Sequence, residues 1–141
     1  MLHDAVTDPG ELTVAELHDR YVTKVRNVID SHGVRTVVES TDVDPATIES
    51  LAAGETPGLT VEEASDILAV PEGSPDSDTV ATLAREELLM GMTTAVLDVE
   101  AVESGIEGEL EAREIQSKVE GRFPMTLREF ALLSQFIDGR R

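Results

Sequence analysis

The stretch Asp44-Pro-Ala-Thr-Ile-Glu-Ser-Leu-Ala-Ala-Gly-Glu-Thr-Pro57 carries the signals of a short helix and of both its ends. Asp44 is a favoured N-cap because its carboxylate accepts hydrogen bonds from first-turn amides, and proline suits the first helical position. Ile48 and Leu51 lie three residues apart and therefore share one face of the helix. The glycine that follows is typical of the position just past a helix end. We predict a helix over residues 45–53.

The same pattern returns in the second half of the chain. Residues 111–124 match 44–57 at an offset of 67, with Ile, Ser, Gly and Pro in register. After one deleted residue, residues 125–130 match 59–64 at an offset of 66. This agreement in the residues that begin and end the helices favours an internal duplication. The alternative is two unrelated helix hairpins that use the same cap chemistry.

Capping boxes mark three further helix starts. In such a box a threonine hydroxyl accepts from the amide three residues later, and a glutamate there reaches back to the threonine amide. Apolar residues recur at three- and four-residue steps behind each box and along residues 79–97, as expected for amphipathic helices. No stretch alternates as a strand would. We predict an all-α fold of about seven helices, with boxes at Thr13/Glu16, Thr60/Glu63 and Thr126/Glu129.

The turn-rich segment 71–78, Pro-Glu-Gly-Ser-Pro-Asp-Ser-Asp, is the predicted internal boundary. We expect residues 1–12 to be a flexible lead-in. Residues 13–70 then form a first helix-turn-helix-like unit and residues 79–141 a second one.

The residues from Val37 to Glu55, followed by Leu59 to Ala64, resemble the helix-turn-helix of phage-repressor-type (Cro/C1-like) domains. The resemblance covers roughly residues 24–70 and, more weakly, 80–137. In that family the helix after the turn enters the major groove of DNA. The resemblance implies two tandem, degenerate units of this kind, with DNA as one candidate partner.

The composition is strongly acidic, with a formal net charge of −18 and only 3% aromatic residues. Residues 36–112 hold 19 acidic residues and a single basic one, Arg85. Lys24 and Lys118 are the only lysines, a style that resembles proteins of salt-loving archaea. The whole chain also looks like a family of small haloarchaeal proteins to which no activity is assigned. At ~1 M salt the Debye length is about 3 Å, so the self-repulsion of such a chain is largely screened.

Composition also limits the chemistry and the location. The absence of cysteine excludes disulfides, thiolate metal sites and thiol nucleophiles. We expect neither a secretory leader nor a membrane span, and therefore a cytoplasmic protein. His3, His18 and His32 lack the spacing of known metal motifs, so we predict no catalytic, metal or cofactor-binding residue.

Cations decide between the candidate partners, because phosphate contacts supply most of the affinity for DNA. The helix predicted over 45–53 has no Arg or Lys, which disfavours DNA contact by the first unit. The second unit is better equipped. Its candidate contacts to nucleic acid or to a protein partner are Arg113, Lys118, Arg122 and Arg128. The alternative for these residues is a solvated, salt-bridged face.

Residues 88–92, Leu-Leu-Met-Gly-Met, are either a partner groove or core, and we favour core. The function that these patterns favour is that of a non-enzymatic regulatory or interaction protein of a halophile, with a protein partner or a second copy of itself. The alternative is a halophilic transcription regulator that binds DNA through the second unit. An enzyme is the third candidate.

Overall fold

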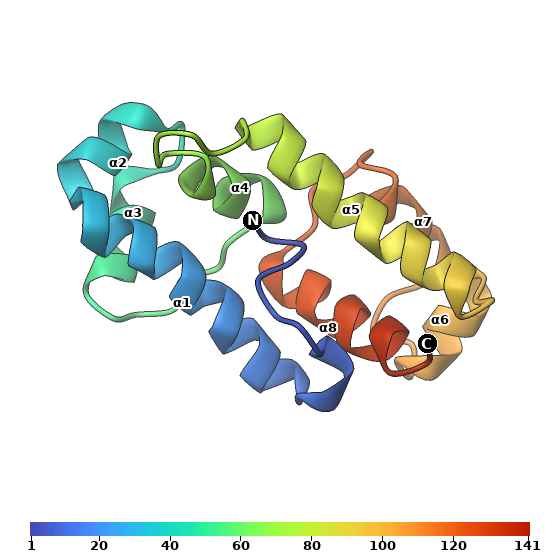
Figure 1. Cartoon of the computed structure of the whole chain (residues 1–141). Helices are drawn as coiled ribbons and strands as arrows, with labels where there is room; N and C mark the ends of the chain where they lie inside the picture. Colours follow the sequence, from blue (N-terminus) through green and yellow to red (C-terminus); the bar gives the residue numbers. More distant parts are fainter.

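The computed structural model describes residues 1–141 and consists of eight α-helices, one short 3-10 helix and no strand (Figure 1). The prediction of an all-α fold is confirmed. In chain order the elements are η1 (Pro9–Glu11), α1 (Val14–His32), α2 (Val34–Ser40), α3 (Pro45–Ala52), α4 (Val61–Leu68), α5 (Ser77–Thr94), α6 (Val99–Gly105), α7 (Ala112–Val119) and α8 (Leu127–Asp138).

The predicted caps are the ones that the helices use. The carboxylate of Asp44 accepts from the Ala46 amide at 2.9 Å. All three predicted capping boxes form in both directions, with threonine hydroxyl and glutamate carboxylate each accepting one amide. These bonds satisfy first-turn amides that have no partner inside the helix. Local side-chain chemistry therefore fixes where α1, α3, α4 and α8 begin.

Two elements differ from the sequence-based expectation. The sequence carries no start signal for the helix α2, which begins after Gly33 without any side-chain cap and buries only Val37. It lacks the cap signal that marked the other helices. The helix expected over 79–97 is α5, which begins earlier because the Asp76 carboxylate accepts from the Thr79 amide at 2.8 Å. It ends earlier because Val96 has a φ of 54°, outside the helical region.

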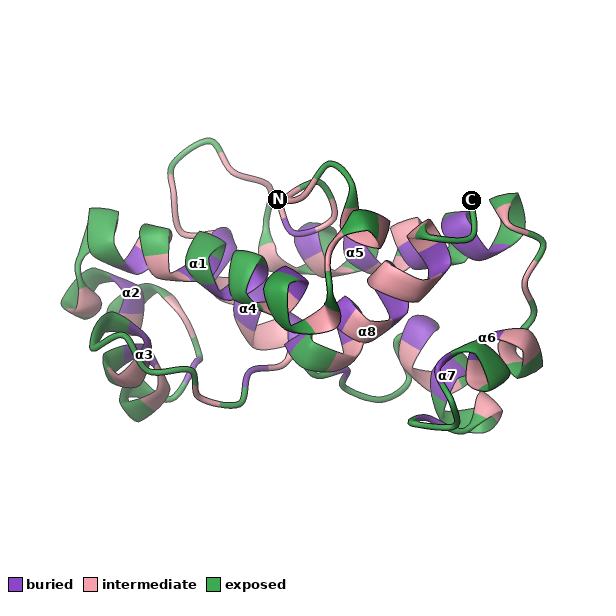
Figure 2. Ribbon diagram, turned by 90° about the horizontal axis from the view of Figure 1, so that it is seen from below, coloured by how far each residue is buried: buried purple, intermediate pink, exposed green.

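The two halves of the chain interlock. We call α4 and α8, the last helix of each half, the closing helices. Each of the two long helices, α1 and α5, packs against both of them. The short pairs α2–α3 and α6–α7 lie at opposite ends of the molecule (Figures 1 and 2). One cluster of 30 buried apolar residues runs through both halves.

Equivalent residues meet at the centre. The Leu127 amide donates to the carbonyl of Leu59, and the Val61 amide donates to the carbonyl of Met125, both at 2.7 Å. These bonds form an isolated antiparallel bridge between Thr60 and Thr126, which the repeat places at the same position. Such a reciprocal pairing of like residues is the geometry of an approximate two-fold axis. The assignment of each half as a helix-turn-helix unit, and the boundaries 13–70 and 79–141, stay predictions.

A second pair of matched contacts supports the two-fold arrangement. Arg26 of α1 donates through Nε to the carbonyl of Leu51, at the end of α3, at 2.8 Å. Arg85 of α5 donates in the same way to the carbonyl of Lys118, at the end of α7, also at 2.8 Å. Each long helix thus supplies an arginine that satisfies a C-terminal carbonyl of the short helix beside it.

The first residues of the chain contact both the core and the last helix. Leu2 is fully buried, and the Gly10 amide donates to the Asp138 carboxylate at 2.9 Å. These contacts do not report on motion, so the flexibility of residues 1–12 stays a prediction. No helix has the length and apolar content needed to cross a bilayer.

The close approach of Gly10 to the end of α8 gives a direct test of this anchoring. A Cβ atom at residue 10 would lie 2.6 Å from the backbone nitrogen of Gly139 and 2.7 Å from its Cα, so one backbone would have to move. We expect Gly10→Ala to lower the free energy of unfolding by about 1–3 kcal/mol, as overpacking does. The measurement is urea unfolding in molar KCl.

Gly58→Ala is the matched control, because nothing lies within 4 Å of its added Cβ. We expect that change to be neutral or slightly stabilising. Equal stabilities for the two variants would show that residues 1–12 do not hold the packed position.

Candidate functional site

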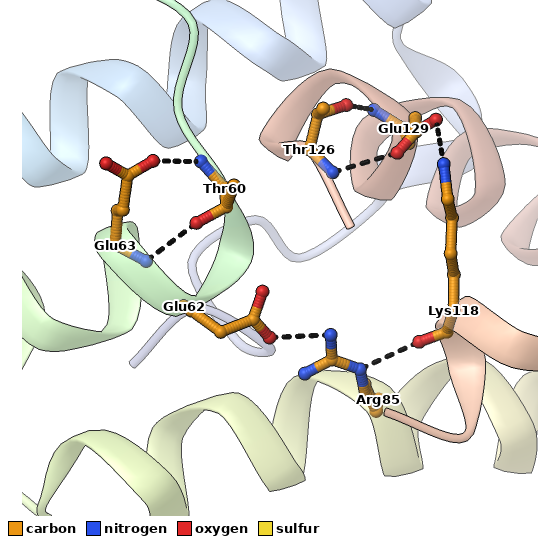
Figure 3. A network of polar contacts seen from close by, with 7 residues as sticks. All are labelled: Thr60, Glu62, Glu63, Arg85, Lys118, Thr126 and Glu129. Carbon is orange, nitrogen blue, oxygen red and sulfur yellow. Dashed lines mark hydrogen bonds and ion pairs between the residues drawn. The ribbon is translucent and has the colours of Figure 1, made fainter. Parts of the chain in front are cut away.

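A polar network joins the two halves beside the central bridge (Figure 3). The Glu129 carboxylate completes the capping box of α8 with Thr126 and also accepts from Lys118 Nζ at 2.6 Å. Lys118 and Glu129 expose only 17% and 20% of their side chains. Arg85 donates to the Lys118 carbonyl and forms an ion pair with Glu62 of α4 at 2.6 Å. The network therefore links α4, α5, α7 and α8.

The first half has no counterpart of the Lys118 ion pair. Leu51 stands at the position that the repeat matches with Lys118. The equivalent capping box of the first half, formed by Thr60 and Glu63, therefore closes without a lysine (Figure 3). At this network the two halves have the same backbone arrangement but different side chains.

Two of the four candidate cations are neutralised by direct ion pairs. Lys118 is held by Glu129, as described above, so its ammonium group is engaged inside the protein. Arg122 is 2.7 Å from Glu120 through Nη2 and remains 68% exposed. Of the two, only Arg122 can be reached by an external anion, and the Glu120 carboxylate competes with such an anion for its guanidinium group.

The other two candidate cations are exposed but share surface hollows with carboxylates. Arg113 lies in a hollow between α6 and α7 whose acidic lining residues are Glu100, Glu103 and Glu111. Arg128, at the start of α8, shares a second hollow with Glu109 and Glu129. The structure therefore does not gather the four predicted residues into one cationic face. It brings Arg113 and Lys118 together in a further hollow, in which Glu114 is the one carboxylate, and places Arg122 and Arg128 elsewhere.

An acidic groove, which no sequence pattern predicted, lies between α5 and α7. The groove has a volume of about 680 Å³. Its apolar lining residues are Ala81, Leu89 and Val119. Four carboxylates line it. Glu62 is paired with Arg85, the one basic residue of the lining, and Glu120 is paired with Arg122, whereas Asp78 and Glu86 form no ion pair. The residues come from three separate helices and one helix end, and only the excess of acidic residues in 36–112 pointed toward such a surface.

Of the apolar residues in 88–92, two belong to the core and two are exposed at the surface. Leu88 and Met92 are buried, as expected for core. Leu89 and Met90 are 40% and 60% exposed, and Leu89 lines the acidic groove. Phe123 is 61% exposed on the loop after α7, in a chain with only 3% aromatic residues.

The apolar stripe of α8 is internal, since Leu127, Phe130, Leu133 and Ile137 are all buried within the chain. That face is therefore not free to pair with a second copy. No group of three or more His, Cys, Asp or Glu side chains is placed to hold a metal ion. Burial lowers the pKa of His18, with Asp19 acting in the opposite direction.

A sequence profile covering residues 17–140 matches the chain. The chain belongs to DUF5791, a family of unknown function. No curated protein and no solved structure matches it. The DUF5791 match spans both halves, and with them the central bridge, the polar network and the acidic groove.

The Lys118–Glu129 pair predicts a pH-dependent contribution to stability. Burial opposes ionisation of Glu129, but the hydrogen bonds from Lys118 and Thr126 and the lysine charge keep its pKa below the usual 4.5. Because the folded-state pKa is the lower one, the carboxylate stabilises the fold above about pH 4.5, and this contribution is lost as the pH falls through the folded pKa. We expect Glu129→Gln to cost about 1–2 kcal/mol at pH 7, and the difference to shrink below about pH 4.

Glu63→Gln is the matched control, since Glu63 closes the equivalent capping box without a lysine partner. Chemical unfolding at several pH values measures both variants, and the loss for Glu129→Gln should be the larger. Equal losses at pH 7 would mean that the lysine adds nothing to the capping box.

Proposed function

We propose that the chain is a non-enzymatic interaction protein, regulatory in role and cytoplasmic in a halophile, whose acidic groove binds a basic segment of a protein partner. The observation that carries this proposal is the composition of the groove. Four carboxylates, of which Asp78 and Glu86 form no ion pair, line it together with three apolar residues, and Leu89 among these is partly exposed. A helix or extended segment with lysine or arginine beside apolar residues matches both features.

Charge complementarity favours this partner over nucleic acid. The chain has a net charge of −18, and its candidate cations are paired with carboxylates or lie beside them. Phosphate contact needs cations that are free to replace counterions. The groove offers the opposite charge, and burial of apolar surface at its floor adds an attraction that salt does not screen.

Neighbouring positions on α5 provide a position-specific test. A photo-crosslinking benzophenone amino acid at residue 89 lies in the groove, whereas at residue 90 it lies on α5 outside the groove, at a site that is more exposed. We expect irradiation in a native high-salt lysate to give one discrete adduct from position 89 and none from position 90. Mass spectrometry should locate the adduct in a lysine- or arginine-rich segment. Glu86→Lys should reduce its yield at least about tenfold by reversing one groove charge.

Equal adducts from both positions, or an adduct in an acidic or uncharged segment, would contradict the proposal. The competing function is tested by fluorescence anisotropy of duplex DNA at molar KCl. Saturable binding that is lost on replacing Arg113, Lys118 and Arg122 by alanine would replace the protein partner with DNA. We expect no saturable binding of duplex.

A further inference from the structure

A cavity of about 340 Å³ lies on the side of α5 that faces away from the acidic groove. Residues 3–9 cover it, and α1, α5 and α8 supply its walls. Its volume falls within the range of small-molecule sites in proteins, about 300–1,000 Å³. The apolar wall includes Leu88, Phe130 and Ile137, all at most 2% exposed to solvent.

The same cavity is bordered by buried polar groups. Tyr21 and Ser134 line it and are only 3% and 8% exposed. The Tyr21 ring lies 5.2 Å from that of Phe130, at an angle of 50°. His3 also lines the cavity, and its Nδ1 atom is buried without a hydrogen-bond partner. This atom has no accessible surface, so it does not face the cavity, and a polar group of a ligand would meet the carboxylates of the lining instead.

The charges around the cavity favour a cationic ligand. Three carboxylates line it, those of Asp4, Glu87 and Asp138, against one guanidinium, that of Arg141, and Asp4 is already paired with the N-terminal ammonium group at 3.0 Å. Arg141 is already engaged, with Nη1 3.3 Å from Glu87 and 3.7 Å from Asp138. An anion would meet three like charges and a cation that is already paired. An ammonium group would instead add a partner to carboxylates that have more acceptor positions than donors.

The titration of Tyr21 reflects the same surroundings. Burial raises its pKa to about 12, a hydrogen bond with Ser134 acts in the opposite direction, and the charges of Asp138 and Glu87 raise it further. The phenol therefore remains protonated at neutral pH and keeps its donor.

We propose that this cavity binds a small amine, with the protonated amino group at Glu87 and Asp138 and an apolar or aromatic body against Phe130, Leu88 and Ile137. The occupant that these walls describe is a primary ammonium on a short apolar or aromatic scaffold. This site shares no lining residue with the acidic groove. Binding of an amine at the cavity is therefore independent of binding of a protein segment at the acidic groove.

Three probes of similar shape separate charge from apolar burial. They are phenethylamine, 2-phenylethanol and phenylacetate, which are cationic, neutral and anionic at pH 7. Titration of the full chain in 2 M KCl is followed by NMR chemical-shift changes at residues of the cavity wall, such as Gly91 and Ser134. We expect saturable binding of phenethylamine, at least about tenfold weaker binding of 2-phenylethanol and no binding of phenylacetate. High salt suppresses diffuse attraction of amines to the acidic surface.

Variants test whether the amine is bound at the cavity. Glu87→Gln should weaken phenethylamine binding roughly three- to tenfold, as loss of one partly screened ion pair does. Glu49→Gln on α3 removes the same charge from an exposed site far from the cavity lining and should leave binding unchanged. Tyr21→Phe retains the ring and removes the hydroxyl, and unfolding curves check that each variant is folded.

Three outcomes would overturn the proposal. The first is shift changes spread over the acidic surface without saturation. The second is 2-phenylethanol binding as tightly as phenethylamine, and the third is equal weakening by Glu87→Gln and Glu49→Gln.

Discussion

The two backbone hydrogen bonds that join residues 59–61 to residues 125–127 determine the arrangement of the rest of the molecule. Each is 2.7 Å long, and the repeat relates one bond to the other. Because the paired residues directly precede α4 and α8, the bridge sets both closing helices side by side at the centre. Each long helix then covers the closing helices of both halves, and their apolar faces merge into one core. Neither half buries its closing helix with its own residues alone.

This common framework makes the differences between the halves informative. Leu51 and Lys118 occupy matched positions, and only the lysine reaches the glutamate of a capping box. Thr56 and Phe123 are matched as well, and the second is a largely exposed aromatic ring. The fold requires neither Lys118 nor Phe123, since the first half reaches the same backbone without them. Residues that break a repeat without being needed for its fold are where function is expected. Lys118 lies in the last turn of α7 and Phe123 follows that helix, whose end, at Val119 and Glu120, lines one side of the acidic groove.

The sequence predicted those features that depend on a few neighbouring residues. Capping boxes involve two side chains three residues apart, so the starts of α1, α4 and α8 could be read directly. The helix α2 was missed because Gly33 offers no side-chain cap. The end of α5 was misplaced because Val96, a β-branched residue, takes a positive φ usually reserved for glycine. The groove and the cavity could not be predicted, since each is assembled from helices and segments whose relative placement depends on the central bridge.

The charge of the surface constrains how such a protein selects a partner. At the molar salt that the composition predicts, the Debye length is about 3 Å, so the net charge of −18 has little reach beyond contact distance. A partner of the kind proposed for the acidic groove would then be recognised through ion pairs formed in contact and through burial of apolar surface, rather than through long-range steering. At the cavity, Glu87 and Asp138 expose 40% and 28% of their side chains, so salt reaches them too, and an amine there would also be held by ion pairs formed in contact. If the proposed segment and amine bind, the same excess of carboxylates acts in recognition only where the fold places it beside apolar residues, at the groove and at the cavity.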